Sequence, residues 1–162
     1  MKEIKLTQNQ VAIVDDDMYE QLNQHKWYAH WNKHTKSFYV RRKSKTKDNK
    51  RHQIDMHREI LGLKPGGILQ GDHINHNTLD NRRSNLRACT RTQNQHNQRP
   101  CRGSTSNYKG VSFYPRGKKW VAAIVENKRY HYLGLFSTEL EAANVYKKAA
   151  LKYHKDFAYV GV

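Results

Sequence analysis

Four polar residues in the middle of the chain have side chains that together can hydrolyse a phosphodiester bond. Asp72 and His73 are adjacent, Asn85 follows Asp72 by 13 residues, and Asn94 follows Asn85 by nine. Such hydrolysis needs a base that activates water and a hard cation that stabilises charge on phosphate oxygens. Histidine titrates near neutrality, which suits His73 to the role of base. Asp and Asn supply the oxygen ligands that Mg²⁺ or Mn²⁺ prefers.

A hairpin of two strands followed by a helix is expected to position these residues. The sequence predicts one strand at 68–72, a long polar loop, a second strand at 86–89 and a helix directly after it. Adjacent strand side chains point to opposite faces, so Asp72 and His73 are expected to diverge, with His73 toward the attacking water. If the helix carries Asn94, its amide oxygen and the Asp72 carboxylate can converge on one cation.

The spacing DH…N…N, with NLRACTRTQN around its last two members, resembles the HNH endonucleases. These nucleases have a ββα-metal (His-Me finger) site, and the chain is most similar to the homing-endonuclease branch that has Asn in place of the last His. The resemblance covers residues 10–98 and includes a VDDD-then-KW pattern and the MHREI segment. It implies that His73 is the general base, that Asp72 and Asn94 bind the metal, and that Asn85 orients the histidine and its loop.

Each of these residues also has an ordinary interpretation. Asp72 could simply cap a turn, where Asp is common, and His73 alone would be a partly exposed polar residue. Asn85 and Asn94 lie in an Asn-rich segment, so only the joint spacing distinguishes them. His57, at the head of a predicted helix, is expected to support the site rather than to react.

Two other catalytic sites are less consistent with the sequence. A zinc site could be assembled from Asp72, His57, His76 and His96, but no HxxxH or Cys-pair spacing supports it. A Ser-His-Asp hydrolase is disfavoured because the chain has no nucleophile elbow.

The segments upstream of the site alternate between short strands and short helices. A helix over 15–22 is expected to be capped by the run of three Asp residues, and 43–51 is expected to be a basic loop. Strands are predicted at 11–14, 26–31 and 38–42, and a strand followed by a helix at 52–61.

The last third of the chain reads as three strands and one helix. Strands at 109–114, 119–125 and 129–136 are separated by two turns, and Thr138 with Glu141 forms a capping box. The helix stripe expected against the sheet consists of Leu140, Ala143, Tyr146, Ala150 and Tyr153, with lysines on the opposite, wet face.

YKGV, RGKKWVAAI, YLGLFST and EAANVYKKAA resemble the plant Apetala/ethylene-response-factor DNA-binding domain, whose free sheet face enters the major groove. The resemblance implies that Trp120, Ala122 and Ile124 face the helix. Where the family reads guanines with arginines, this chain has other residues, so the docking mode carries over but the target sequence does not. The alternative is a sheet that serves only as a packing platform. The groove-facing set implied is Lys109, Ser112, Tyr114, Arg116, Lys118, Ala123, Val125, Tyr130 and Tyr132.

Composition limits the remaining possibilities. The 162 residues (19.1 kDa) carry a formal charge of +16, a pI of about 9.9 and a mean hydropathy of −1.03. This charge suggests a polyanionic partner, most simply nucleic acid. No apolar run is long enough for a membrane span, and the N-terminus lacks the apolar region of a secretory signal. With only Cys89 and Cys101, a disulfide scaffold is excluded and a reducing cytoplasm, that of a bacterial host, is expected.

These inferences combine into an expectation of an α+β protein with two modules. Residues 1–100 form an HNH endonuclease module with a ββα-metal core at about 66–98, residues 101–107 a linker, and residues 108–162 a three-stranded antiparallel sheet packed on one helix. The expected function is metal-dependent cleavage of double-stranded DNA by a phage or mobile-element enzyme, with Mg²⁺ or Mn²⁺ as cofactor and no obligate protein partner. The alternatives are a non-cleaving DNA-binding regulator that keeps the nuclease scaffold and, more distantly, an RNA-binding protein.

Overall fold

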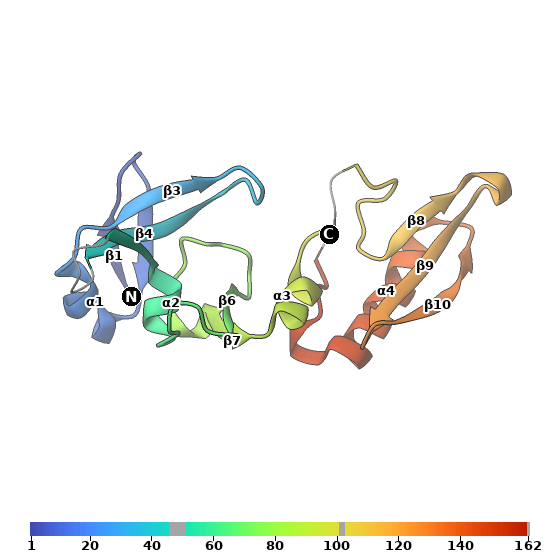
Figure 1. Ribbon diagram of the computed structural model, residues 1–162. Helices are drawn as coiled ribbons and strands as arrows, with labels where there is room; N and C mark the ends of the chain where they lie inside the picture. Colours follow the sequence, from blue (N-terminus) through green and yellow to red (C-terminus); the bar gives the residue numbers. More distant parts are fainter. Residues whose placement is uncertain (46–50, 101–102, 162) are drawn as a thin grey trace. The chain divides into compact units, whose positions relative to one another are not determined.

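The computed structural model describes residues 1–45, 51–100 and 103–161 of the chain (Figure 1). The chain divides into two compact units, Met1–Arg91 and Thr92–Val162. Both mix helices with small antiparallel sheets, and no helix among the described residues could cross a membrane. Cys101 and the tip of the expected basic loop, 46–50, lie outside the described residues. The expected module boundary at 100/101 stays a prediction.

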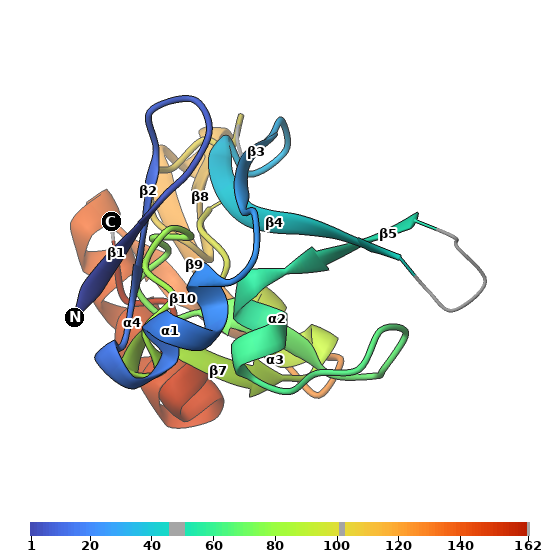
Figure 2. The same ribbon diagram turned by 90° about the vertical axis from the view of Figure 1, so that its left-hand side faces the viewer.

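The first unit begins with a hairpin whose buried side chains pack in the core of that unit. Strand β1 (Lys2–Lys5) pairs antiparallel with β2 (Val11–Val14), and helix α1 (Asp16–Asn23) follows (Figure 2). Alternation along β2 buries Ala12 and Val14. The indole N–H of Trp27 donates to the Leu22 carbonyl at 2.7 Å, which ties the end of α1 to the next strand. The core of this unit contains Ile4, Ala12, Val14, Leu22, Trp27, Val40 and Met56.

The expected side-chain cap of α1 is wrong. Asp15 is the N-cap residue, but its carboxylate makes no cap hydrogen bond. Its Oδ2 instead accepts from the backbone N–H of Arg83 at 2.8 Å, a residue distant in sequence. This carboxylate therefore joins the start of α1 to the segment that precedes the second strand of the site.

A three-stranded sheet and a short helix follow the hairpin. Strands β3 (Tyr28–Asn32), β4 (Ser37–Lys45) and β5 (Arg51–Asp55) pair antiparallel in that order, and helix α2 (Met56–Ile60) follows β5 directly. Two ion pairs tie β4 to the segments after it, Arg41 to Asp55 at 2.6 Å and Arg42 to Glu59 at 2.8 Å.

The hairpin expected to carry the site is present. Strand β6 (Gln70–His73) pairs antiparallel with β7 (Leu86–Cys89), and a short 3₁₀ turn, η1 (Arg83–Asn85), precedes β7. The intervening loop is anchored to β2, since the N–H of Ile13 donates to Leu79 at 2.9 Å and that of Asn81 donates to Ile13 at 2.8 Å. The Thr78 hydroxyl also donates to the Phe38 carbonyl on β4.

The second unit packs a sheet against one long helix, as expected. Helix α3 (Arg91–Asn97) leads into it, and strands β8 (Val111–Tyr114), β9 (Lys119–Glu126) and β10 (Arg129–Phe136) pair antiparallel in the order β10-β9-β8. The 3₁₀ turn η2 (Pro115–Gly117) joins β8 to β9, and η3 (Lys155–Phe157) follows helix α4 (Glu139–His154). The core is formed by Val111, Ala122, Ile124, Ala142, Ala143, Tyr146, Ala149 and Ala150.

One member of the expected α4 stripe is misplaced. Leu140 is 58% exposed, whereas Ala142 and Ala149 are buried against the sheet. Small side chains let the helix lie close to the strands, so the buried face is centred on alanines and Tyr146. The capping box is confirmed: Thr138 Oγ1 accepts from the Glu141 N–H, and Glu141 Oε2 accepts from the Thr138 N–H, both at 3.2 Å.

Candidate functional site

Strand β6 places Asp72 and His73 on opposite faces of the β6–β7 hairpin, as the alternation of strand side chains requires. Asp72 lies opposite Arg87 in the register, and His73 lies opposite Leu86. Both side chains are buried. One face of the hairpin therefore presents a carboxylate and the other an imidazole.

Asp72 is held in an ion pair with Arg87. The guanidinium Nε and Nη2 atoms of Arg87 lie 2.8 and 2.7 Å from the same carboxylate oxygen, Oδ2. Cys89 follows on the same face of β7, and burial together with the nearby Asp72 charge raises its pKa to about 11. Cys89 is thus a neutral thiol that packs beside the ion pair rather than a nucleophile.

His73 faces a pocket of aromatic and amide groups. Its ring centroid lies 5.0 Å from that of His57 and 6.3 Å from that of Tyr39, and its Nε2 lies 3.4 Å from Oδ1 of Asn81. Burial lowers the pKa of His73 below its usual value of 6.5, although the Asn81 contact and the Asp72 charge act in the opposite direction. The imidazole is therefore neutral at pH 7 and carries a lone pair that can accept a proton.

His57 reaches His73 because of a glycine between them. A Cβ at Gly71 would overlap the Cδ2 atom of the His57 ring and stand 3.1 Å from its Nε2. Burial, followed by the nearby His73, lowers the pKa of His57 to about 4, so this ring too is neutral. The His57 ring is buried against β6, and its expected supporting role stays a prediction.

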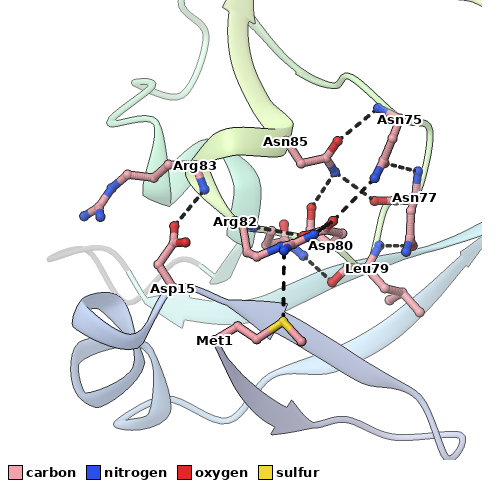
Figure 3. Close-up of polar contacts among 10 residues, drawn as sticks. Met1, Asp15, Asn75, Asn77, Leu79, Asp80, Arg82, Arg83 and Asn85 are labelled. Atoms are coloured by element: carbon pink, nitrogen blue, oxygen red, sulfur yellow. Dashed lines mark hydrogen bonds and ion pairs between the residues drawn. The ribbon is translucent and has the colours of Figure 1, made fainter.

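Asn85 holds the loop that follows His73 (Figure 3). Its Oδ1 accepts from the Asn75 N–H at 2.9 Å, and its Nδ2 donates to the Asp80 carbonyl at 2.8 Å and to the Asn77 carbonyl at 3.4 Å. The Asn85 carbonyl accepts from the N–H of Ile74, the residue after His73, at 2.9 Å. Asn85 thus fixes the backbone around the histidine, while a direct action on its ring stays a prediction.

A further anchor of this loop was not predicted from sequence. Asp80 is almost fully buried and pairs with Arg82 through both carboxylate oxygens, at 2.8 and 2.7 Å. The hydrogen bonds from Arg82 lower the pKa of Asp80. The signal available in the sequence was the acidic residue two positions before an arginine in the polar loop, a pattern too common to single out.

Asn94 lies on α3, in the second unit, so its pairing with Asp72 on one cation stays a prediction. The donor set fits such a group, since a carboxylate and an amide oxygen are ligands for a hard cation. Among the described residues there is no group of three or more His, Cys, Asp or Glu side chains that could hold a metal.

The sheet of the second unit has one face covered by α4 and one open face. Trp120, Ala122 and Ile124 point to the helix, as expected. Arg116 and Lys118 lie exposed at η2, between β8 and β9. The positions of the open face are Ser112, Tyr114, Lys119, Val121, Ala123, Val125, Tyr130, Tyr132 and Leu135, by strand alternation and register.

Lys109, the first residue of the implied DNA-binding set, has other partners. Its ammonium donates to the carbonyls of Gln95, His96 and Gln98 at 2.7, 2.8 and 2.8 Å, at the end of α3. A cation at a helix C-terminus is favoured by the unsatisfied carbonyls there. Lys109 thus anchors α3 within the second unit.

Comparison with known proteins gives matches in both units. A family model described as HNH endonuclease matches residues 62–96, and one described as AP2 domain matches residues 106–155. Uncharacterized HNH endonuclease L560 of Acanthamoeba polyphaga mimivirus is 29% identical over 151 residues, which cover 91% of this chain and 72% of that protein.

Two plant proteins match the second unit alone. APETALA2-like protein 2 of Oryza sativa subsp. indica is 44% identical over 55 residues, covering 33% of this chain and 12% of that protein. The AP2-like ethylene-responsive transcription factor TOE2 of Arabidopsis thaliana is 40% identical over 52 residues, covering 32% of this chain and 11% of that protein. No solved structure matches. The matches support a chain in which a segment similar to HNH endonucleases is fused to an AP2-like DNA-binding domain.

Proposed function

We propose that the protein is a metal-dependent endonuclease of the homing type that hydrolyses phosphodiester bonds in duplex DNA. The observation that carries this proposal is the β6–β7 hairpin, which directs the Asp72 carboxylate to one face and a neutral imidazole to the other. A regulator that only binds DNA has no need of a carboxylate and an imidazole on opposite faces of one hairpin.

In this proposal His73 accepts the proton of the attacking water, and the rings of the buried His57 and the half-buried Tyr39 restrict the orientation of its imidazole. Asn85 fixes the loop after His73, so the base keeps its position during the reaction. Asp72 and Asn94 would hold a divalent cation, Mg²⁺ or Mn²⁺. When bound, such a cation stabilises charge on the scissile phosphate and on the leaving 3′ oxygen.

The same proposal assigns DNA recognition to the second unit. The open sheet face is the surface proposed to enter the major groove, which admits strands as well as helices. Arg116 and Lys118 are exposed cations at its edge that can contact phosphates. The residues proposed to contact DNA are Ser112, Tyr114, Arg116, Lys118, Tyr130 and Tyr132.

Cleavage of supercoiled plasmid DNA in Mg²⁺ tests the proposal. His73→Ala should lose about 10²–10⁴-fold in cleavage rate, the usual contribution of a general base, while its DNA affinity is unchanged. His34→Ala, a change of an exposed histidine in the same unit, should cleave like the wild type. Full activity of His73→Ala contradicts the assignment of the base. Binding without cleavage by the wild type in Mg²⁺ and in Mn²⁺ favours the DNA-binding regulator instead.

A further inference from the structure

The centre of the open sheet face is apolar. Four of its side chains are far more exposed than core residues of their type: Val125 at 51%, Tyr130 at 66%, Tyr132 at 56% and Leu135 at 44%. None of the described strands or helices of the second unit covers them. Hydrophobic surface of this kind, gathered in one place on a protein, marks an interaction site.

The register joins these side chains into one strip. Tyr130 lies opposite Val125, Tyr132 opposite Ala123, and Leu135 opposite Val121. Side chains directly opposite on neighbouring strands are in contact distance of each other. The strip therefore runs along the β9–β10 pair, made of small or branched groups on β9 and mostly aromatic rings on β10.

Cations frame the strip at both ends of the strands. Arg116, Lys118 and Lys119 are exposed at the β8–β9 turn, and Lys128 and Arg129 at the β9–β10 turn. Glu126 lies on the face of the sheet that α4 covers, where its Oε2 is 3.8 Å from Nε2 of His131. Within the described residues 111–136, no carboxylate points to the open face. An apolar strip between two cationic ends complements a surface with apolar groups at its centre and phosphates at its margins.

The major groove of B-DNA is such a surface only where it carries thymine. The thymine C5-methyl is the one apolar group that the base edges present in that groove, and phosphates line both margins. Paired hydrogen bonds to guanine come most often from arginine, and the open positions of β8, β9 and β10 carry no guanidinium. Lys119, at the start of β9 and therefore at the end of the face, is the cation among these positions. Their side chains are instead suited to packing around methyl groups.

We propose that the open face of the β8–β10 sheet recognises duplex DNA through the C5-methyl groups of thymines, with Val121, Val125 and the ring of Tyr132 as the contacting groups. This rests on the proposed function, which assigns DNA recognition to this unit, and it adds the class of sequence that is bound. Thymine-containing steps then define the central base pairs of the site.

Replacing thymine by uracil tests the proposal, because deoxyuridine differs from thymidine only by the absent methyl group. The full chain carrying His73→Ala is used to select its preferred duplex from a random pool, so that cleavage does not interfere. The selected duplex is then rebuilt with deoxyuridine at each thymine in turn, and Kd is measured by fluorescence anisotropy at one salt concentration. Each contacted methyl that is removed should weaken binding about three- to fivefold, as expected for burial of one methyl-sized group.

Substitutions on the sheet then locate the contact. The double variant Val121→Thr/Val125→Thr keeps the branched shape that strands favour but replaces one methyl of each valine with a hydroxyl. It should reduce the uracil penalty, which is the loss of affinity when deoxyuridine replaces thymidine, at the thymines that these side chains contact. Leu151→Gln, an equally exposed apolar position on α4, should leave the penalty unchanged. Thermal unfolding confirms that both variants are folded.

The outcomes separate the inference from the proposal on which it rests. Specific binding with equal affinity for thymine and uracil duplexes, or a uracil penalty that the Val→Thr pair does not alter, overturns the inference alone. Absence of any DNA binding by the full chain overturns both.

Discussion

The imidazole of His57 lies against the α-carbon of Gly71, in the space that a Cβ would fill in any other residue. The two residues belong to α2 and β6, and their contact brings the His57 ring to 5.0 Å from that of His73. A glycine in a strand often marks a site where another group approaches closely. Here that group is the ring that packs against the proposed base.

Gly71→Ala tests this relationship. The added Cβ would overlap Cδ2 of His57 and approach Leu61, so the ring must move and with it the packing around His73. We expect a loss of about 1–3 kcal/mol in the free energy of unfolding, as for overpacked sites, measured by urea denaturation. Without urea, where Gly71→Ala is folded, its rate of DNA cleavage should still be lower than that of the wild type.

Ala88, the register partner of Gly71, provides the matched control. It is exposed, so Ala88→Ser should change neither stability nor cleavage by more than the experimental scatter. Equal stability and activity of Gly71→Ala and the wild type would show that the close packing of His57 is not needed for the site.

Asn85→Ala removes three hydrogen bonds of a buried amide at once. The Asn75 N–H loses its acceptor, and the Asp80 and Asn77 carbonyls lose a donor. The bond to the Asp80 carbonyl is buried, and a buried group left unsatisfied costs about 1–3 kcal/mol. Asn85→Ala should therefore be destabilised in urea denaturation and slow in DNA cleavage.

The neighbouring exposed residue gives the comparison for Asn85. Ser84→Ala alters the same turn without touching this network and should retain both stability and cleavage. If Asn85→Ala unfolds like Ser84→Ala, the loop after His73 is held by other contacts, of which the Asp80–Arg82 pair is the strongest candidate.

Local patterns were sufficient to predict most elements of the fold. The bounds of β2 and β7 agree with the predicted strands, because alternation and turn residues define them within the segment itself. The capping box of α4 is confirmed for the same reason, since both partners lie within one turn. Strand β1 was missed because Ile4 is its one buried residue, too weak an apolar pattern to detect.

The contacts that shape the site come from residues far apart in sequence, and these were not predictable. Alternation along β6 separated Asp72 from His73, as expected, but the ion pair to Arg87 depends on the hairpin register. The Asp15 carboxylate was expected to cap α1, and instead accepts from Arg83. The ammonium of Lys109, which its motif predicts to contact DNA, donates to carbonyls at the end of α3, and a contact with DNA stays a prediction. In each case the observed partner depends on register or tertiary contacts that local patterns do not show.

Asn94→His examines the proposed metal ligand on α3. Imidazole suits Mn²⁺, Co²⁺ and Ni²⁺ better than it suits Mg²⁺, so the variant should cleave more slowly in Mg²⁺ and gain relative activity with the softer ions. Plasmid cleavage rates measured in parallel with each metal give this profile. Gln95→His, an exposed neighbour on the same helix, should keep the wild-type profile. An unchanged profile for Asn94→His would remove this residue from the proposed ligand set.

Acid should destabilise the second unit through a pair of stacked histidines. The ring centroids of His96 on α3 and His154 on α4 are 3.6 Å apart, and the two rings are nearly parallel. Nε2 of His154 donates to the Val125 carbonyl at 3.0 Å. Burial, the neighbouring His154 and the Lys109 ammonium lower the pKa of His96 to about 4, and burial lowers that of His154. Both rings are therefore neutral in the folded state at pH 7.

Because an unfolded histidine titrates near 6.5, the unfolded chain takes up protons at higher pH than the folded one. The stability supplied by the neutral stack is complete above about pH 6.5 and is lost as the pH falls toward 4. Differential scanning calorimetry should show a lower Tm of the second unit at pH 5 than at pH 7.5, by about 4–8 °C for each kcal/mol lost in a unit of this size. His96→Phe keeps a planar ring that cannot be protonated, so its Tm should depend less steeply on pH, whereas His34→Phe, at an exposed site, should follow the wild type. Identical pH dependence in His96→Phe and the wild type would show that protonation of this stack does not control the stability of the unit.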